Sequence, residues 1–238
     1  MRRRLKDLKG DKLLAFEQQL SETRLERVRH AARQRQRGLM VLMEDVHNPH
    51  NLAAIARSCD AFGVQDIGFT ATHQNLFDPE QVGKVSSSSA SKWLDYHIYT
   101  DGTRACLESL KADGWQIVAT VATPDAISIY EMDFAQIEPM VLLVGNEHAG
   151  LSDEAIALAD HHVTIPMRGM IQSFNVSVAT AITLAEITRQ RDASSQRFTV
   201  DDDEAQALLV EFIPFPAPSP TRAKANPRCM IHTRHTSD

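Results

Sequence analysis

Between residues 39 and 191, short apolar runs alternate with longer segments whose apolar residues recur at helical spacing. The apolar runs, which we expect to be strands, cover residues 39–46, 64–71, 93–99, 115–122, 139–145 and 162–166. The expected helices cover residues 51–63, 103–114, 152–160 and 173–191. Strands that are joined through helices pair in parallel, and the helices then cover both faces of the sheet. The alternation therefore predicts an α/β fold with a mostly parallel sheet and helices on both faces.

Two segments of different composition flank this region. Residues 1–38 contain 12 Lys/Arg and 5 Asp/Glu, a net charge of +7 that leaves −13 for the rest of the chain. Leu25, Val28 and Ala31/Ala32 recur there at helical spacing, which predicts a basic helical extension. The C-terminal extension is Pro-rich and aperiodic from about Pro214, which predicts disorder. The expected organisation is an extension at 1–38, a main domain at 39–191 and a second extension at 192–238.

The uneven charge suggests a partner. A basic arm on an acidic body is suited to a polyanion that docks on the arm. A solvated helix with balanced faces explains a short charged segment equally well, so the charge alone does not decide between the two.

Composition argues against several protein classes. With 43% hydrophobic residues the chain can bury one sizeable core, yet it has no run of 18 apolar residues and no apolar segment after its basic start. We therefore expect neither a membrane span nor a secretory signal, and the cytoplasm is the expected compartment. Cys59, Cys106 and Cys229 lie far apart without a C-x-x-C spacing, which argues against a disulfide framework or a thiolate zinc site.

Polar residues gather at three strand-to-helix junctions, and ligands of open parallel sheets collect at the carboxyl ends of strands. Junction 1, residues 45–57, contains Asn51 as the expected helix N-cap and Arg57 on the following turns. Arg57 could also form only an ion pair at a domain or subunit edge. His47 and His50 lack a third metal ligand nearby, so turn or capping roles are favoured for them.

Junction 2, residues 145–152, reads Gly-Asn-Glu-His-Ala-Gly-Leu-Ser. Gly145 and Gly150 allow a tight turn and Ser152 can cap the next helix, but a plain turn does not require Glu147. The junction lacks the Lys-Ser/Thr ending of a P-loop, and the chain has no G-x-G-x-x-G, so ordinary nucleoside-triphosphate and dinucleotide sites are disfavoured.

Junction 3, residues 165–177, carries more polar side chains than one helix cap needs. Ser173 could cap the helix, but Gln172, Asn175 and Ser177 exceed that requirement. A bound ligand explains the surplus, and hydrogen bonds to neighbouring loops explain it equally well.

Taken together, the three junctions resemble the three motifs of the SPOUT superfamily of RNA methyltransferases, over about residues 24–191. Arg57, six residues after Asn51, fits the first motif, "VGNEHAGLS" the second and "IPMRGMIQSFNVSVATA" the third. The phrase "MEDVHNPHNLAAIARSCDAFGV" resembles most the TrmH branch, the tRNA (guanosine-18) 2′-O-methyltransferases. This resemblance implies methylation of a ribose 2′-hydroxyl at guanosine 18 of tRNA, in a homodimer, without a metal.

The resemblance also implies a deep C-terminal trefoil knot that holds S-adenosylmethionine. The positions that match the cofactor loops are Thr120, Val121, Ala122, Val144, Gly145, Asn146, Ile165, Met167, Ser173 and Phe174. Phe174 departs from the family, in which leucine is usual, and the Pro-rich tail departs from the family's usual C-terminal helix.

The resemblance implies catalytic roles for Arg57, Asn51, Glu147, Ser173 and Asn175. Because guanidinium groups essentially never deprotonate, we expect Arg57 to stabilise the developing alkoxide and to bind a phosphate. Asn51 and Glu147 would orient Arg57 or the ribose hydroxyl, and Ser173 and Asn175 would shape the pocket.

The expected RNA contacts are Arg24, Arg27, Arg33, Arg35, Arg37, Lys84 and Lys92. Other readings are methylation of another tRNA position or of ribosomal RNA, a non-catalytic RNA-binding protein on the same scaffold, and a small-molecule nucleotide enzyme.

Overall fold

The computed structural model describes residues 21–71, 93–212 and 229–231. Lys84 and Lys92 lie outside the described residues, and so does most of the tail that the sequence predicts to be disordered. The chain forms two compact units. One combines Met1–Gln36 with Thr199–Asn226, and the other combines Arg37–Phe198 with Pro227–Asp238.

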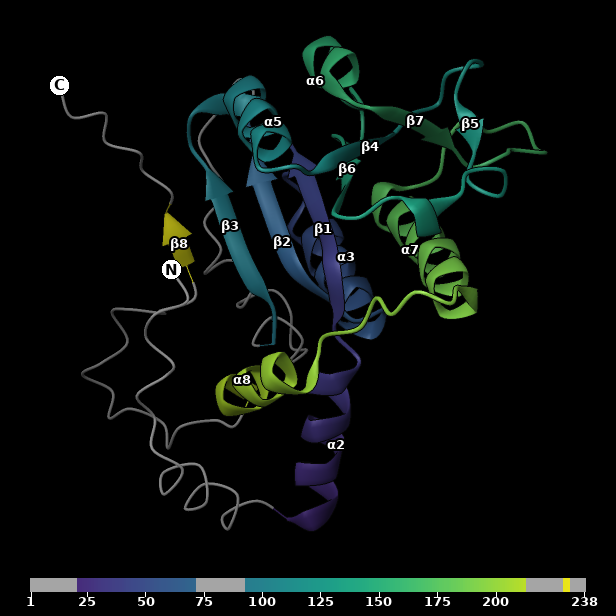
Figure 1. The fold of residues 1–238 in the computed structure, drawn as a ribbon. Helices are drawn as coiled ribbons and strands as arrows, with labels where there is room; N and C mark the ends of the chain where they lie inside the picture. Colours follow the sequence, from purple (N-terminus) through teal and green to yellow (C-terminus); the bar gives the residue numbers. More distant parts are fainter. Residues whose placement is uncertain (1–20, 72–92, 213–228, 232–238) are drawn as a thin grey trace, which may run out of the picture. The chain divides into compact units, whose positions relative to one another are not determined.

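The larger unit is built on a sheet with the strand order β5-β7-β4-β6-β1-β2-β3-β8 (Figure 1). In chain order the strands are β1 (Gln36–Glu44), β2 (Val64–Thr70), β3 (Asp95–Tyr99), β4 (Gln116–Thr120), β5 (Ile127–Ser128), β6 (Met140–Val144), β7 (His161–Thr164) and β8 (Cys229–Ile231). The pairings β1–β6, β2–β3, β3–β8, β4–β6, β4–β7 and β5–β7 are all parallel. The predicted parallel α/β sheet is confirmed.

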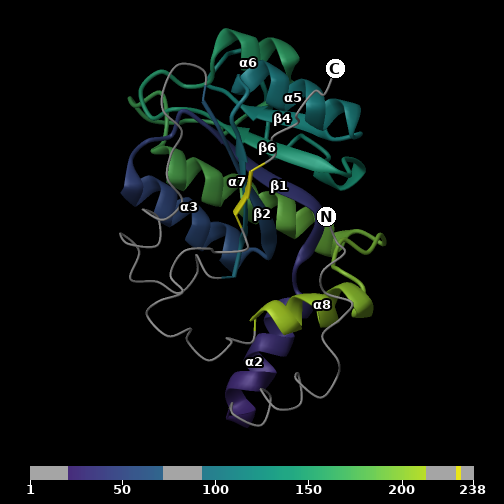
Figure 2. The same cartoon turned by 90° about the vertical axis from the view of Figure 1, so that its left-hand side faces the viewer.

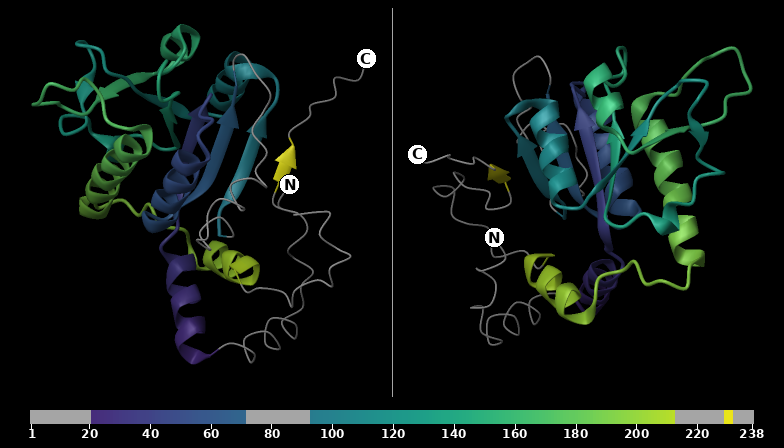
Figure 3. Two further views of the ribbon diagram at one scale, coloured as in Figure 1. Left: turned by 180° about the vertical axis from the view of Figure 1, so that it is seen from behind. Right: turned by 45° about the horizontal axis from the view of Figure 1, so that its top comes forward.

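Helices cover both faces of this sheet (Figure 2 and Figure 3). α3 (Pro49–Ala61) and α7 (Val176–Ala193) pack on one face, together with the short 3-10 helix η2 (Phe134–Gln136). α5 (Gly102–Ala112) and α6 (Asp153–Leu158) pack on the other. Among the described helices, none is long and apolar enough to cross a membrane.

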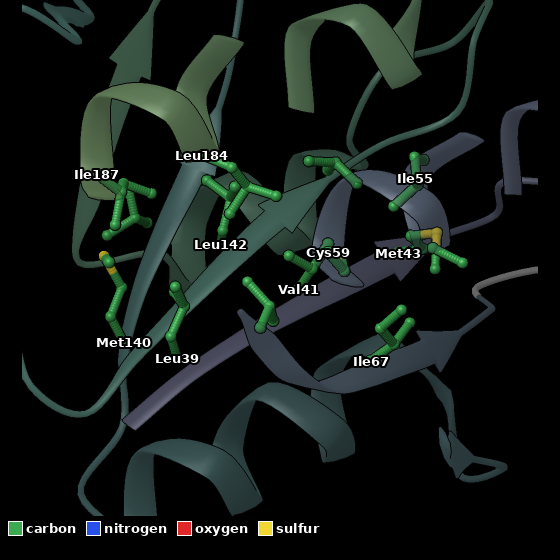
Figure 4. Packing of buried hydrophobic residues seen from close by; sticks show 14 of the residues in the cluster. Leu39, Val41, Met43, Ile55, Cys59, Ile67, Met140, Leu142, Leu184 and Ile187 are labelled. Carbon is green, nitrogen blue, oxygen red and sulfur yellow. The ribbon is translucent and has the colours of Figure 1, made fainter. Parts of the chain in front are cut away.

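The core explains why β1 reads as a continuous apolar run. Leu39, Val41 and Met43 join the core cluster under α3 and α7, whereas Met40 and Leu42 join the cluster under α5 and α6. Because successive side chains of a strand point to opposite faces, a strand covered on both faces is apolar at every position. Figure 4 shows the first cluster, with Ile55 and Cys59 of α3 and Leu184 of α7 turned toward the strands.

The smaller unit pairs the two chain extensions. α2 (Glu22–Arg33) buries Leu25, Val28 and Ala32, as the helical spacing predicts, and packs with α8 (Asp202–Phe212). Arg35 differs from its neighbouring arginines, because it is only 2% exposed and its guanidinium carbon lies 5.2 Å from the centroid of the Phe212 ring. The prediction of Arg35 as a phosphate contact is therefore wrong, since its side chain is buried on α8.

Several element boundaries differ from the sequence predictions. β1 begins at Gln36 instead of residue 39, and α7 begins at Val176 instead of residue 173. β5 and η2 are too short for a periodic pattern and were not predicted. Within the tail predicted to be disordered, Cys229–Ile231 forms strand β8, which pairs with β3.

Candidate active site

The sheet order brings the three junctions to one edge. β7, β4, β6 and β1 are consecutive in the sheet and their pairings are parallel, so their carboxyl ends lie along the same edge. Junction 1 follows β1, junction 2 follows β6 and junction 3 follows β7. Residues from three distant parts of the chain can therefore meet there.

In junction 1, helix α3 begins about one turn earlier than the sequence predicts. The N-cap of α3 is Asn48, whose Oδ1 accepts a hydrogen bond from the backbone N–H of His50 at 2.9 Å, and Pro49 occupies the first helical position. Pro is favoured at that position because it has no N–H to leave unsatisfied. The prediction of Asn51 as the cap is wrong. Asn51 lies inside the first turn, where it is 8% exposed and its amide is available for other partners.

Those partners come from the other two junctions. Asn51 donates from Nδ2 to Oε1 of Glu147 at 2.7 Å, and its Oδ1 accepts from Nδ2 of Asn175 at 3.1 Å. The Oδ1 of Asn175 in turn accepts from the backbone N–H and the hydroxyl of Ser177, at 2.9 and 2.6 Å. One chain of hydrogen bonds thus links all three junctions.

The ends of this chain fix the direction of both amides. A backbone N–H can only donate, so the atom of Asn175 that faces Ser177 must be the oxygen, and its amide nitrogen must face Asn51. Asn51 then presents its own nitrogen to Glu147, and an ionised carboxylate can only accept. The other carboxylate oxygen of Glu147, Oε2, has no partner among the described residues, so it can accept a hydrogen bond from a substrate.

The third junction has a different cap from the one predicted. Asn175 caps α7, whereas Ser173 is exposed and its side chain makes no hydrogen bond within the part of the chain that the structure describes. Asn175, and not Ser173, is the cap because its side-chain carbonyl oxygen accepts from the N–H two residues ahead, as Asn and Asp caps commonly do. Phe174 is 37% exposed beside it.

The second junction is a tight turn that depends on glycine. A Cβ on Gly145 would lie 2.4 Å from both the carbonyl carbon of Gly150 and the backbone nitrogen of Leu151. Gly150 has a φ of 73°, in the left-handed region, and Asn146 and Gly150 exchange backbone hydrogen bonds of 2.9 and 3.0 Å. Ser152 caps α6 as predicted, accepting from the N–H of Ala155 at 3.1 Å.

Arg57 does not join this hydrogen-bond chain. Six residues separate it from Asn51, which places the two side chains about 120° apart around the axis of α3. Arg57 is exposed, and no hydrogen bond or ion pair to it is found among the described residues. The structure of a single chain therefore unites Asn51, Glu147 and Asn175 but not Arg57 or Ser173.

The predicted cofactor positions follow three neighbouring strands. The Thr120 hydroxyl donates to the carbonyl of Leu143 at 3.1 Å, and the Val121 N–H donates to the carbonyl of Val163 at 2.9 Å, so the end of β4 is attached to both β6 and β7. The remaining positions vary in exposure: Val144 and Gly145 are buried, Asn146, Ile165 and Met167 are half-buried, and Ala122 is exposed.

One further side chain, Glu44, and one backbone group, the carbonyl of Asp45, also belong to this edge. Glu44, the last residue of β1, is 1% exposed and accepts both the N–H and the hydroxyl of Ser152 at 2.8 Å. The carbonyl of Asp45 accepts from Nδ2 of Asn146 at 2.8 Å. A carboxylate at the end of an apolar strand was the available signal for Glu44.

Among the described residues, His47 and His50 belong to no cluster of metal ligands. The His47 side chain is exposed, and its Nε2 lies 4.0 Å from a carboxylate oxygen of Asp45. Within residues 21–71, 93–212 and 229–231, no group of three or more His, Cys, Asp or Glu side chains could hold a metal ion.

Comparison with known proteins shows to which family the chain belongs. Residues 38–185 match the model of the SpoU rRNA Methylase family, which covers all three junctions. The chain belongs to the SpoU methylase family. The matched SpoU domain contains the whole hydrogen-bond chain from Glu147 to Ser177, whereas α2 and α8 lie outside it.

SpoU relatives resemble this chain over most of its length. It is 40% identical to a tRNA (guanosine(18)-2'-O)-methyltransferase of Thermus thermophilus, over 81% of this chain and 97% of the relative. It is 35% identical to the enzyme of that name from Escherichia coli, over 81% of this chain and 82% of the relative.

Solved SpoU structures match the fold. The TrmH/SpoU tRNA modifying enzyme of A. aeolicus superposes with a TM-score of 0.67 at 35% identity, over 81% of this chain and 95% of the other. The SpoU methyltransferase AviRb of Streptomyces viridochromogenes, solved in complex with the cofactor AdoMet, superposes with a TM-score of 0.56 at 32% identity, over 68% and 60% of the two chains.

Proposed function

We propose that this protein transfers a methyl group from S-adenosylmethionine to the ribose 2′-hydroxyl of guanosine 18 in tRNA. The observation that carries the proposal is the hydrogen-bond chain that joins Asn51, Glu147 and Asn175 at one edge of a SpoU domain. Relatives that carry this activity in their names are 35–40% identical over about four fifths of the chain.

The residues at the ends of β4, β6 and β7 fit the cofactor. Gly145 packs closely against the backbone of Gly150 in a tight turn, and the attachment of Thr120 and Val121 to the neighbouring strands keeps a second loop beside it. Backbone N–H and C=O groups are strong hydrogen-bonding partners for a nucleoside. When bound, S-adenosylmethionine supplies a methyl group that is already activated on a sulfonium sulfur. We assign its binding to these loops together with residues 165–167 and Ser173–Phe174.

Glu147 and Asn51 orient the ribose hydroxyl. Asn51 fixes one oxygen of the Glu147 carboxylate, and Oε2 is then directed to accept the hydrogen bond of the 2′-hydroxyl. Fixing the acceptor in advance holds the hydroxyl in one orientation, which lowers the entropic part of the barrier. Asn175, held by Ser177, keeps Asn51 in place.

Arg57 supplies positive charge to the reacting oxygen and to an RNA phosphate. An arginine stays protonated at neutral pH, so its role is electrostatic. Its exposure, and its position about 120° from Asn51 around α3, favour a site that is completed between two copies of the chain.

A homodimer also explains where apolar side chains are exposed. Among the described residues, the large hydrophobic side chains with high exposure are Ile127, Tyr130, Met170, Ile171, Phe174 and Val178. All six come after β4 or β7 in the chain, and β5, which contains Ile127, pairs with β7. We propose that they belong to a surface that a second copy of the chain covers.

We further propose that the C-terminal part of the SpoU domain forms a deep trefoil knot. It rests on the resemblance to SPOUT enzymes and on the match to solved SpoU structures. The cytoplasmic location and the independence from metal ions stay predictions.

RNA docking is assigned to α2. Arg24, Arg27 and Arg33 are exposed along this helix, and Arg37 is exposed just after it. A variant with Arg24, Arg27 and Arg33 replaced by Gln should bind tRNA more weakly and with a flatter salt dependence, by about 0.9 in the log–log slope for each phosphate that is no longer neutralised. The measurement is a filter-binding titration at several salt concentrations, with Arg104→Gln on α5 as the control. An unchanged slope would remove α2 from the interface.

The decisive experiment for the function is a methylation assay. The purified protein is incubated with labelled S-adenosylmethionine and total tRNA, and the modified nucleotide is mapped. Label at guanosine 18 is expected. Label only at another position or only in added ribosomal RNA would support one of the alternative substrates, and binding of tRNA without any transfer would support the non-catalytic reading.

Arg57→Ala tests the assigned mechanism. It should lower turnover by about 100-fold or more, the usual cost of removing a group that stabilises an oxyanion, while the affinity for S-adenosylmethionine stays close to that of the wild type. Arg104→Ala removes an exposed arginine on α5 and should leave both quantities unchanged. Substantial turnover in the Arg57→Ala variant would remove Arg57 from the mechanism.

A further inference from the structure

Junction 2 is attached at one end to Glu44, the last residue of β1, and at the other to Asp45, the residue after it. At its start, Asn146 donates from Nδ2 to the carbonyl of Asp45 at 2.8 Å, and its Oδ1 accepts from the N–H groups of His148 and Ala149 at 2.8 and 3.0 Å. At its end, both carboxylate oxygens of Glu44 are bound to Ser152. Two consecutive residues at the end of one strand thus hold the segment that carries Glu147.

In both hydrogen bonds between Glu44 and Ser152, Ser152 is the donor and Glu44 is the acceptor. A hydroxyl has one hydrogen, and because the Ser152 oxygen accepts from the N–H of Ala155, that hydrogen is directed to Glu44. The backbone N–H of Ser152 donates to the second carboxylate oxygen. An acceptor with two oxygens is therefore required at residue 44, and a Gln side chain would turn its NH₂ group toward one of the two donors.

Capping α6 does not require this carboxylate. Ser152 alone supplies the cap, and a carboxylate that is only 1% exposed is costly to bury unless its hydrogen bonds compensate. What Glu44 adds is a fixed distance between β1 and the end of junction 2. The other end of that junction leads directly from Asn146 to Glu147.

We infer that Glu44 and Ser152 are positioning residues, which act on the reaction by holding Glu147 against Asn51. The inference rests on the proposed function, because it assumes that Glu147 contacts the ribose hydroxyl. A shift of about 1 Å in such a group can cost about 100-fold in rate. Glu44 itself is buried on the sheet side of the junction and does not touch the substrate.

The test compares turnover in Glu44→Gln, Ser152→Ala and Ser152→Thr under single-turnover conditions, at a temperature at which every variant is folded. Glu44→Gln and Ser152→Ala should lower the rate by about 10- to 100-fold, with the dissociation constants for tRNA and for S-adenosylmethionine, measured separately, within about twofold of the wild type. Ser152→Thr keeps the hydroxyl and should restore most of the rate. Arg104→Ala is the matched control, because Arg104 bonds to Glu154 of α6 and to Glu108, and not to Glu44 or Ser152.

A double-mutant cycle separates positioning from general stability. If Glu44 acts through Glu147, Glu44→Gln should change the rate by less than about twofold when Glu147 is already Gln. An equal loss of rate in both backgrounds would overturn the inference, and so would a lower Tm with an unchanged rate in folded Ser152→Ala. If the wild-type protein transfers no methyl group to any RNA, the proposed function fails and the inference fails with it; if the wild type is active, the cycle judges the inference alone.

Discussion

Junctions 2 and 3 follow neighbouring parts of the same sheet edge, yet they are held in different ways. In junction 2, the N–H groups of residues 146, 148, 149, 150 and 152 all donate within the segment or to Glu44. In junction 3, no hydrogen bond to residues 166–174 is found within the described part of the chain, and Met170 is fully exposed. The next residue of the junction that forms hydrogen bonds is Asn175, the cap of α7.

The difference separates two kinds of site residue. Glu147 lies in a segment whose geometry is fixed by the protein before any ligand arrives, which suits a group that must hold a reacting hydroxyl. Ser173 and Phe174 lie in a segment that gains its hydrogen bonds from elsewhere, from the cofactor and the second subunit in the function that we propose. Segments with few internal hydrogen bonds are those that open most easily.

The largest difference between the two junctions should appear when one methyl group is added to each of them as a Gly→Ala substitution. Gly145→Ala places a Cβ 2.4 Å from backbone atoms of Gly150 and Leu151, so the turn must move. We expect a loss of about 1–3 kcal/mol in the free energy of unfolding, as is usual for overpacked sites, and a large loss of turnover. Gly169→Ala in junction 3 meets no atom within 4 Å and should change stability by less than about 1 kcal/mol. Chemical denaturation of the two variants measures the contrast, and equal losses would contradict it.

A smaller but more direct effect should appear in hydrogen exchange of the wild-type protein. The bonded amides of residues 146–152 should exchange more slowly than those of residues 166–174, because each must first open its hydrogen bond. Addition of S-adenosylmethionine should slow exchange mainly in residues 166–174. Slow exchange of that segment in the free protein would mean that the two junctions are equally fixed. The readout is mass spectrometry of peptides that cover each junction.

The smallest effect, a change in thermal stability, should come from Asp160, the residue just before β7, the strand that leads into junction 3. Desolvation of the Asp160 carboxyl tends to raise its pKa, but hydrogen bonds from the Ile117 N–H and from Lys111, with the charge of Lys111, outweigh this and lower the pKa. A carboxyl with a depressed folded-state pKa adds stability above its unfolded pKa, and this stability is lost as the pH falls below about 4.

Asp160→Asn should therefore lower the Tm at neutral pH and flatten the acid side of its pH profile. Because the side chain is partly exposed, the change should be no more than about 4 °C, the scale of a surface ion pair. Calorimetry between about pH 3 and pH 7, the range that spans the titration of a carboxyl, measures it. A loss of the same size at both ends of that range would contradict the assigned cause.

Much of the fold could be predicted from local patterns. The continuous apolar run of β1 required burial on both faces, and the spacing of Leu25, Val28 and Ala32 predicted the buried face of α2. The helix starts were less accurate, because several residues near each start are suitable caps. Asn48 and Asn175 became the caps instead of Asn51 and Ser173, since their side chains reach the N–H two residues ahead.

The candidate site was predictable in its residue types but not in its contacts. Asn51 and Glu147 are 96 residues apart, and Asn51 and Asn175 are 124 apart, so no local rule connects them. Arg35 has the same surroundings in the sequence as its exposed neighbours, and only the packing of α8 buries it. Glu44 was missed for the same reason, because its partner Ser152 lies 108 residues further along the chain.

The sequence by itself determined the class of fold, the order of the longer strands and helices between residues 39 and 191, and the three segments that bear polar residues, because apolar periodicity and turn chemistry act over a few residues. It did not predict β5, η2, α8 or β8. Only the tertiary structure decided which of those polar side chains meet. The parallel strand order places the ends of β1, β6 and β7 along one edge, and donors and acceptors at that edge then pair by distance, whatever their separation in the chain.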